Sequence, residues 1–264
     1  MSLRDILKDK LPEKKLSLLP KGFEVIGDIA IINIPLQLED EKHLIAQALV
    51  SHRRGVMVVL RKTNKLHGTK RVGDFEILLG DRTTTVHREN GCDFHVDIAR
   101  TYFSGKMYFE RKRIAELVRN GEDVLVLFCG AGPFLIPIAK TRNVNIIGIE
   151  NNPLACTFCK KNTELNKVDA DIILGDANSI NLIFRKDFDR IVMPTPYGQD
   201  YFLSLARFIL KPEGTIHFYT FKKDFEIAHF KRLLEEKGWR VRSYRNCGGV
   251  APRVNRYVFD MQMI

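Results

Sequence analysis

The sequence predicts an α/β fold with a mostly parallel sheet, helices on both faces and an antiparallel C-terminal hairpin, preceded by a small α+β domain. Two observations carry this prediction. From residue 123 onward, short apolar strands alternate with helical segments, which is the pattern of a parallel sheet. In the first hundred residues, apolar strands follow one another with little helix between them. We therefore divide the chain into domains at 1–100 and 101–264.

The first domain is predicted to contain a mixed or antiparallel sheet. Residues 23–34 hold two apolar runs split by Gly27-Asp28, which is a hairpin pattern. Apolar residues at helical spacing predict a helix over 39–52, and residues 3–10 fit a short amphipathic helix. Further strands are expected at 56–60, 75–79, 83–87 and 94–98.

The second domain is predicted to begin with a strand at 124–128, followed by a glycine-rich turn and a helix through Ile136. Later strands are expected at 145–149, 172–174, 190–193, 215–221, 240–244 and 256–261. Later helices are expected at 153–166, 201–210 and 225–237. A terminal hairpin that closes a parallel sheet is typical of methyltransferases and not of dehydrogenases.

Composition limits the classes of function. The net charge of +10 favours a polyanionic partner, because excess positive charge attracts phosphate backbones. No apolar run approaches the roughly 20 residues that span a bilayer, so no membrane partner is expected. The five cysteines are unevenly spaced and predict no disulfide framework, which favours a reducing cytoplasm. The oligomeric state stays open, with a monomer favoured.

The motif that carries chemistry is the glycine turn at residues 124–134, VLVLFCGAGPF. Gly130 and Gly132 let the backbone turn sharply against a ligand without a Cβ clash. Glu150 follows Gly130 by twenty residues, at the end of the next strand, where a carboxylate can bind both hydroxyls of a ribose. This geometry suits an adenosine cofactor.

Two details favour S-adenosyl-L-methionine over a dinucleotide. The third glycine of a dinucleotide motif is replaced by Leu135, which weakens a pyrophosphate site. Asp176 and Ala177 follow the third strand, where a carboxylate can accept the adenine amino group. The structural alternative is that the glycines form a tight turn and that Glu150 and Asp176 cap helices.

The chain resembles the archaeal and eukaryotic tRNA guanine-37 N1-methyltransferases and the related wybutosine-pathway aminocarboxypropyl transferases. The resemblance runs from about Gly22 to the C-terminus. It rests on the glycine turn and on six further segments: residues 26–31, 85–91, 96–97, 102–104, 110–114 and 188–196, with Ala251-Pro252 near the end.

The resemblance leaves the branch of the family open. The Gly-Ala-Gly-Pro-Phe turn is similar to that of the methyltransferase branch. The Asn-x-Pro motif common in that branch is replaced by Pro194-Thr195-Pro196, and Ser104-Gly105-Lys106 replaces the usual Ser/Asn-Pro-Arg. We also expect no additional tRNA-gripping domain at the N-terminus.

The resemblance implies methylation of guanine 37 at N1, beside the tRNA anticodon. The family's general base falls on Glu110, and its arginine at guanine O6 falls on Arg71. The residues it implies for the cofactor are Phe103, Arg111, Phe128, Gly130, Gly132, Phe134, Glu150, Asn151, Asp176, Ala177 and Pro194. The structural alternatives are a helix N-terminal carboxylate for Glu110 and a solvated strand residue for Arg71.

Three other functions stay open. The first is a wyosine-pathway reaction, either carbon methylation of the tricyclic precursor or aminocarboxypropyl transfer. The second is a catalytically weak tRNA-binding protein that retains the cofactor. The third, an unrelated dehydrogenase, is disfavoured by Leu135 and by the terminal hairpin. No metal is expected, because Cys156 and Cys159 form the one C-x-x-C pair and fit a core-facing position on a helix.

Overall fold

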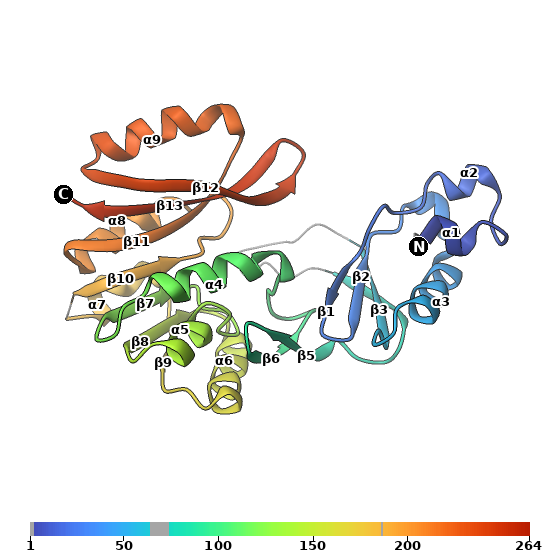
Figure 1. Ribbon diagram of the computed structural model, residues 1–264, viewed down its shortest axis with the longest axis horizontal. Helices are drawn as coiled ribbons and strands as arrows, with labels where there is room; N and C mark the ends of the chain where they lie inside the picture. Colours follow the sequence, from blue (N-terminus) through green and yellow to red (C-terminus); the bar gives the residue numbers. More distant parts are fainter. Residues whose placement is uncertain (1–2, 64–73, 186) are drawn as a thin grey trace. The chain divides into compact units, whose positions relative to one another are not determined.

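The structure is a computed structural model that describes residues 3–63, 74–185 and 187–264. The chain forms two compact units (Figure 1). The first unit contains Met1–Arg88 and Asp93–Gly105, and the second contains Glu89–Cys92 and Lys106–Ile264. No helix among the described residues is long and apolar enough to cross a membrane.

The first unit is built on a four-stranded mixed sheet in the order β1-β2-β3-β4. Its strands are β1 (Glu24–Ile26), β2 (Ile29–Ile32), β3 (Val58–Lys62) and β4 (Phe75–Leu79). β2 and β3 are parallel, while β1 and β4 run antiparallel to their neighbours. The predicted hairpin turn is confirmed: Gly27 has φ +58°, and a Cβ there would meet the Thr85 hydroxyl.

Helices cover this sheet and complete its core. They are α1 (Leu3–Leu7), α2 (Glu13–Leu16), η1 (Leu36–Leu38) and α3 (Lys42–His52). Leu7, Leu38 and Leu49 from these helices are fully buried with Ala30 and Val59 of the sheet. Strands β5 (Thr84–Glu89) and β6 (Cys92–Asp97) form a separate two-stranded sheet.

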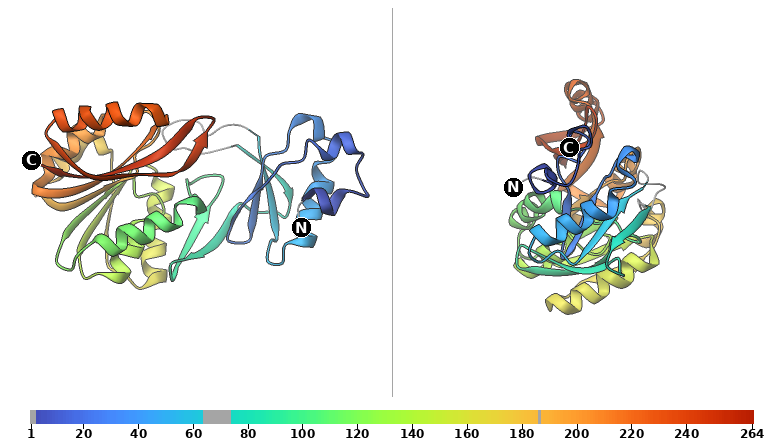
Figure 2. Two further views of the ribbon diagram at one scale, coloured as in Figure 1. Left: turned by 45° about the horizontal axis from the view of Figure 1, so that its top comes forward. Right: turned by 90° about the vertical axis from the view of Figure 1, so that its right-hand side faces the viewer.

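The second unit contains a seven-stranded sheet in the order β12-β13-β11-β10-β7-β8-β9. Its strands are β7 (Asp123–Leu127), β8 (Asn145–Glu150), β9 (Asp171–Leu174), β10 (Phe188–Met193), β11 (Leu210–Lys222), β12 (Trp239–Ala251) and β13 (Val254–Met263). The five strands from β11 to β9 are parallel, and β13 runs antiparallel to β11. The predicted terminal hairpin is therefore confirmed, as β12 and β13 at one edge (Figure 2).

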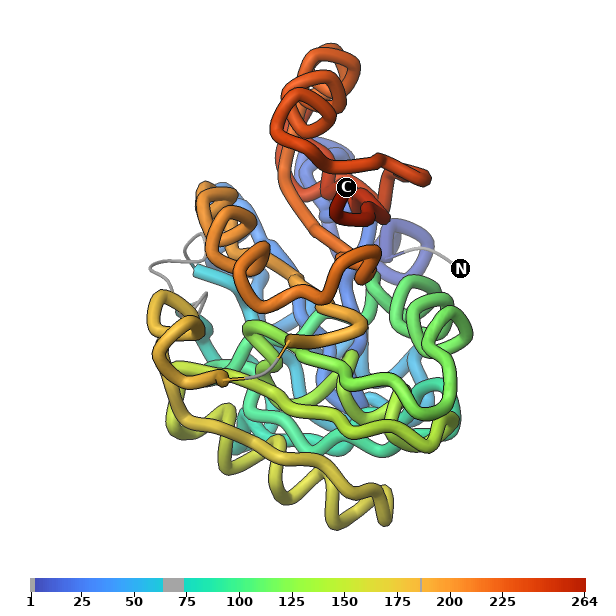
Figure 3. The backbone as a smooth tube through the Cα atoms, turned by 90° about the vertical axis from the view of Figure 1, so that its left-hand side faces the viewer, coloured from blue at the N-terminus to red at the C-terminus, as the bar shows by residue number. Residues whose placement is uncertain are grey.

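Helices of the second unit pack in two groups. They are α4 (Tyr108–Leu117), α5 (Leu135–Thr141), α6 (Pro153–Asn166), α7 (Ile180–Ile183), α8 (Phe202–Ala206) and α9 (Ile227–Glu236). Four 3-10 turns flank them: η2 (Gly105–Met107), η3 (Ala177–Ser179), η4 (Arg207–Ile209) and η5 (Asp224–Glu226). Helix α5 contacts both α4 and α6, whereas α7 contacts α8, and α9 packs on β12. Figure 3 traces this path from β7, in green, to β13, in red.

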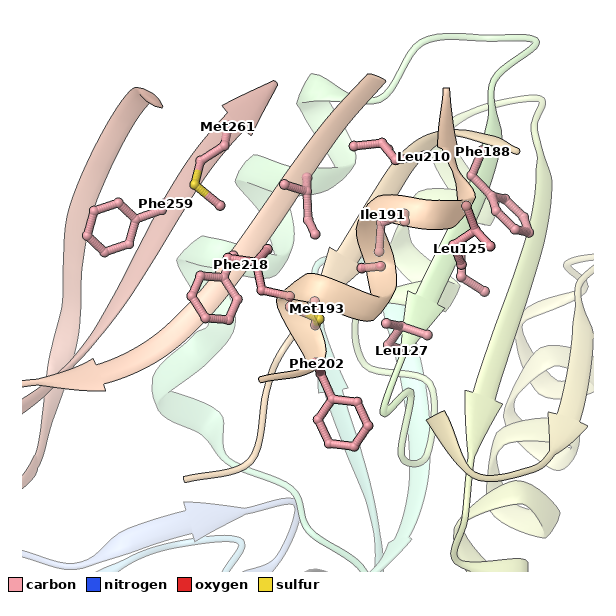
Figure 4. Packing of buried hydrophobic residues seen from close by; sticks show 14 of the residues in the cluster. Leu125, Leu127, Phe188, Ile191, Met193, Phe202, Leu210, Phe218, Phe259 and Met261 are labelled. Carbon is pink, nitrogen blue, oxygen red and sulfur yellow. The ribbon is translucent and has the colours of Figure 1, made fainter. Parts of the chain in front are cut away.

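One hydrophobic core of the second unit lies between the sheet and helices α7 to α9. Leu125, Ile191 and Phe218 point into it from the central strands, with Phe202 of α8 (Figure 4). Successive side chains of a strand alternate between faces. The residues between these apolar ones therefore point to the face that carries α4, and several of them are polar.

The predicted elements are confirmed in kind and order, and the largest differences at their ends are in three places. The helix expected over 201–210 ends at Ala206 and continues as a short 3-10 turn. Strand β11 begins at Leu210, earlier than the expected 215. Both strands of the terminal hairpin are longer than expected, because glycine and arginine residues with no apolar alternation still pair across it. The short helices α2 and α7 were not predicted.

Candidate active site

The glycine turn begins where β7 ends. Phe128 has φ +53°, Gly130 +55° and Gly132 +88°. A Cβ on Gly132 would lie 2.8 Å from Ile136 Cδ1 and 3.0 Å from Cys159 Sγ, so this position requires glycine. Phe128 takes a left-handed conformation that is costly for a bulky residue, and such strain collects at functional sites.

Glu150, at the end of β8, is hydrogen-bonded directly to the turn. Its Oε2 accepts the Gly130 N–H at 2.8 Å, and its Oε1 accepts the Asn152 N–H at 2.9 Å. The side chain is half-buried. Each carboxylate oxygen can accept a second hydrogen bond. The carboxylate can therefore hold the turn and still bind two ribose hydroxyls.

Glu150 and Asp176, the two acidic residues predicted to bind the cofactor, differ in their structural roles. The cap of α6 is Asn152, whose side chain accepts the Leu154 N–H at 3.1 Å, so Glu150 is not the capping residue. Asp176 is exposed and caps η3, accepting the Asn178 N–H at 2.9 Å. The capping alternative considered for both residues therefore applies to Asp176 alone.

The loop after β10 is fixed at both ends. Thr195 is buried, and its N–H and hydroxyl both donate to the Met193 carbonyl, at 2.8 and 3.1 Å. Asp200 accepts a hydrogen bond from the Thr220 hydroxyl at 2.7 Å and forms an ion pair with Lys222 at 2.5 Å. Both partners are on β11. Between these anchors, Pro194 is half-buried and Tyr197 is 66 % exposed.

Glu110 lies in the first turn of α4 and is buried. Its Oε2 accepts the Tyr219 hydroxyl at 3.0 Å and Arg113 Nη2 at 2.8 Å. Arg113 Nε lies 3.1 Å from both carboxylate oxygens. The ring of Tyr219 packs against Phe134 of the glycine turn, with centroids 5.3 Å apart. One tyrosine therefore joins the Glu110 carboxylate to the turn.

Comparisons with known proteins agree with this geometry. Residues 85–242 match the TRM5/TYW2 methyltransferase domain model, and residues 3–83 match the TYW2 N-terminal domain model. The chain belongs to the TRM5/TYW2 family. It is 35 % identical to the tRNA (guanine(37)-N(1))-methyltransferase Trm5b of Pyrococcus abyssi, over 99 % of this chain and 80 % of that protein.

Two further relatives represent both branches of the TRM5/TYW2 family. The tRNA(Phe) (4-demethylwyosine(37)-C(7)) aminocarboxypropyltransferase of Pyrococcus horikoshii is 33 % identical, over 99 % of this chain and 96 % of that protein. A solved structure described as the complex of aTrm5 and tRNALeu aligns with a TM-score of 0.88 at 32 % identity. That alignment covers 100 % of this chain and 78 % of the other.

The second unit brings together most of the residues that the family resemblance implies. The glycine turn carries Phe128, Gly130, Gly132 and Phe134, and the ends of neighbouring parallel strands carry Glu150, Asn151, Asp176, Ala177 and Pro194. Asn151 is exposed and Ala177 is buried. The carboxyl ends of parallel strands form one edge of the sheet, which is where α/β proteins bind ligands.

Two of the predicted residues lie away from the glycine turn and the strand ends, and a third is not described by the structure. Arg111 is 2 % exposed and forms a two-point ion pair with Glu89. Phe103 belongs to the first unit, where it is buried against His87 and Phe94, with ring centroids 5.2 and 5.7 Å away. Arg71 lies outside the described residues. The roles of these residues in binding or catalysis stay predictions.

The three cysteines near the turn are part of the core. Cys129, Cys156 and Cys159 are free and buried, which confirms the core-facing position predicted for the C-x-x-C pair. A hydrogen bond to Cys159, together with burial, raises the pKa of Cys129, and burial raises the pKa of Cys156 to about 11. The described residues contain no cluster of three or more metal-ligating side chains.

The sequence analysis missed the polar residues that surround Glu110. Arg113 follows Glu110 by three residues, which is the spacing of neighbours on a helix face, so this pair was available in the sequence. Tyr219, His217 and Asp260 stand at alternate positions of otherwise apolar strands. A polar side chain at such a position either faces solvent or belongs to a buried network. Only its exposure in the structure distinguishes the two cases.

Proposed function

We propose that this chain methylates N1 of guanosine 37 in tRNA, beside the anticodon, with S-adenosylmethionine as methyl donor. The observation that carries the proposal is the alignment with Trm5b over 99 % of the chain. It is supported by the glycine turn held by Glu150 and by a buried carboxylate beside that turn. We place the reaction in the cytoplasm, since none of the five cysteines, all of them among the described residues, forms a disulfide.

The residues of the second unit fit the proposed cofactor. Glu150 offers two carboxylate oxygens at the end of β8, where an adenosine ribose binds in this type of sheet. Gly130 and Gly132 leave room for close approach of the backbone. When bound, the cofactor supplies an activated methyl group on a sulfonium. The exposed Asp176 is proposed to accept the adenine amino group.

Glu110 is proposed to remove the proton from guanine N1. N1 carries a proton in the neutral base, so the proton must leave as the N1–methyl bond forms. A positioned general base contributes roughly 10²–10⁴-fold. Negative charge that develops on O6 would be stabilised by a cation, which is the role proposed for Arg71. Protonated Glu110 then releases its proton to solvent.

The small first domain is proposed to contribute contacts to the tRNA. The charge of +10 supports electrostatic attraction of the RNA backbone. The oligomeric state stays open, and a monomer is favoured.

A second reaction has specific support. The match of residues 3–83 to the TYW2 N-terminal domain, and the similarity to an aminocarboxypropyltransferase, favour transfer of the aminocarboxypropyl group to a wyosine precursor. Methylation of that precursor fits the same site as a further alternative, because one relative is named for both guanine-37 and 4-demethylwyosine methylation.

One experiment separates these reactions. The protein is incubated with guanosine-37 tRNA, or with tRNA that carries the wyosine precursor, and with cofactor labelled separately on the methyl and aminocarboxypropyl groups. Mass spectrometry then identifies the modified nucleoside. The proposal expects methyl label in N1-methylguanosine. If aminocarboxypropyl label appears in a wyosine derivative and no methyl label appears in guanosine 37, the second reaction replaces the proposed N1 methylation.

A further inference from the structure

We propose that Tyr219 and Asp260 are positioning residues for the Glu110 carboxylate. Tyr219 acts directly, through its hydroxyl, and Asp260 acts through Arg113. The inference rests on the proposed role of Glu110 as the base. It assigns different tasks to the two carboxylate oxygens: Oε2 is the anchored oxygen, and Oε1 is the oxygen that accepts the guanine proton.

The hydrogen bonds of Glu110 carry this assignment. Oε2 accepts from Tyr219 at 3.0 Å, from Arg113 Nη2 at 2.8 Å and from Arg113 Nε at 3.1 Å. Among the described residues, Oε1 accepts one hydrogen bond, from the same Nε at 3.1 Å. Three donors saturate the lone pairs of Oε2, whereas Oε1 retains one. Oε1 is therefore the carboxylate oxygen that can accept the proton from N1.

Strand alternation places these groups on one face of the sheet. Phe218, Phe259 and Met261 point into the core of Figure 4, so Tyr219 and Asp260 point to the opposite face, toward α4. His217 and Asp260 are direct partners across β11 and β13. Tyr219 is 1 % exposed, and burial followed by the charge of Glu110 raises its pKa. Its hydroxyl therefore stays protonated and donates.

Asp260 holds the other side of the Arg113 guanidinium. Arg113 Nη1 donates to Asp260 Oδ2 at 2.7 Å, while Nη2 reaches Oδ1 at 3.3 Å. Asp260 also accepts the Ser243 hydroxyl at 2.8 Å and His217 Nδ1 at 2.6 Å. Burial opposes ionisation of Asp260, but the hydrogen bonds from His217 and Arg113 outweigh it and hold its pKa below the ordinary range.

His217 continues the network as a neutral group. Arg190 Nη1 lies 2.7 Å from His217 Nε2, and an arginine can only donate, so Nε2 accepts and Nδ1 carries the proton to Asp260. Burial lowers the pKa of His217 and so favours this neutral form. Arg190 in turn pairs with Glu122 at 2.6 Å. The contacts from Glu122 through Arg190 and His217 to Asp260 therefore each join a donor to an acceptor.

Arg113 is shared between two carboxylates, Glu110 and Asp260. One guanidinium divides its charge between two carboxylates, so Glu110 is held without being fully neutralised. A further titratable group near this carboxylate is Cys247 of β12. Burial and the charge of Glu110 raise the pKa of the Cys247 thiol to about 12, so it stays neutral. Asp260 thus holds Arg113 beside Glu110 and shares its charge.

Two substitutions should then move the titration of Glu110 in opposite directions. Tyr219→Phe keeps the ring on Phe134 and removes one donor, so Glu110 should protonate at higher pH. Asp260→Asn leaves the whole Arg113 charge to Glu110, so Glu110 should protonate at lower pH. Turnover should fall about tenfold or more in each case, because one hydrogen bond to a charged group is lost or redirected.

The experiment measures this titration twice. Single-turnover methylation of guanosine-37 tRNA is followed against pH at saturating cofactor. In parallel, carbon-13 NMR follows the Glu110 carboxyl carbon without substrate, with its resonance assigned by its loss in Glu110→Gln. Tyr257→Phe is the matched control for Tyr219→Phe, since Tyr257 donates to Asp224 at 2.7 Å. Asp189→Asn, at a carboxylate paired with Lys211, is the control for Asp260→Asn.

Opposite shifts of about one pH unit in both measurements, with unchanged controls and cofactor affinity, support the proposal. Shifts in the same direction, or none, overturn it. If Asp260→Asn does not fold, Tyr219→Phe decides alone, since an unshifted titration in that variant refutes the anchored oxygen. If the wild type makes no N1-methylguanosine while the NMR titrations move apart, the proposed function fails and the positioning of Glu110 stands.

Discussion

Replacing Glu150 by glutamine tests whether the carboxylate at the end of β8 binds the cofactor ribose. The substitution keeps the size of the side chain and removes its charge. Glu150 accepts the N–H groups of Gly130 and Asn152, one on each oxygen. A carboxamide has one acceptor oxygen, so its NH₂ group must face one of these two donors.

The expected loss follows from these contacts. A hydrogen bond to a charged acceptor contributes about 1.5–3 kcal/mol, and leaving a partly buried donor unpaired costs about 1–3 kcal/mol. The first effect weakens ribose binding, and the second loosens the glycine turn in the free and bound protein alike. We therefore expect the binding free energy to fall by about 3 kcal/mol, which corresponds to roughly 10²-fold in Kd.

Calorimetry with S-adenosylhomocysteine and its 2′-deoxy analogue separates the two effects. If Glu150 binds the ribose, the wild type should discriminate strongly between these ligands, and Glu150→Gln should discriminate little. Glu164→Gln, at an exposed position of α6, is the control and should bind like the wild type. Equal discrimination by the wild type and Glu150→Gln would show that the carboxylate supports only the turn, and the ribose assignment would be wrong.

Four further outcomes are expected. Glu110→Gln should lower turnover by roughly 10²-fold or more with little change in cofactor affinity, and partial recovery at high pH, where guanine N1 ionises unaided, is the accompanying check; wild-type turnover would refute the base. The affinity for tRNA should fall steeply as salt rises, because +10 net charge implies counterion release, and a flat filter-binding titration would contradict this. Gly132→Ala should lower the free energy of unfolding by about 2 kcal/mol in denaturant melts. Gly121→Ala, at φ +83° with no atom within 4 Å of its Cβ, should cost less than Gly132→Ala, and equal losses would show that the turn has no steric constraint. Because the pKa of Asp260 is lowered in the folded state, its contribution to stability is present above the unfolded value of about 3.9 and is lost as pH falls. Asp260→Asn should therefore flatten the acid branch of stability against pH, and an unchanged acid branch in urea melts would contradict this.

The order and type of the main elements could be predicted because each depends on local pattern. The helix at 153–166 and the strand at 75–79 match the structure residue for residue, since each has a clear apolar period and defined ends. The ends of the terminal hairpin could not be predicted, because Arg245 and Gly249 have no apolar period and pair only because β13 lies beside them. The helix ending at Ala206 is shortened because residues 207–209 form a 3-10 turn that leads into β11.

The candidate site likewise has one part that the sequence predicts and another that only the structure reveals. Gly130, Gly132 and Glu150 form a motif of fixed spacing, because a strand, a turn and the next parallel strand repeat at short sequence distance. The sequence by itself therefore determined the fold class, the glycine turn and the position of its acidic partner. The surroundings of Glu110 come from Tyr219, 109 residues later, and, through Arg113, from Asp260. Sheet order alone brings these strands to α4, and strand alternation alone turns their polar side chains toward it. Only the tertiary structure decided which oxygen of Glu110 is held, because hydrogen bonds between distant residues leave no periodic trace in the sequence.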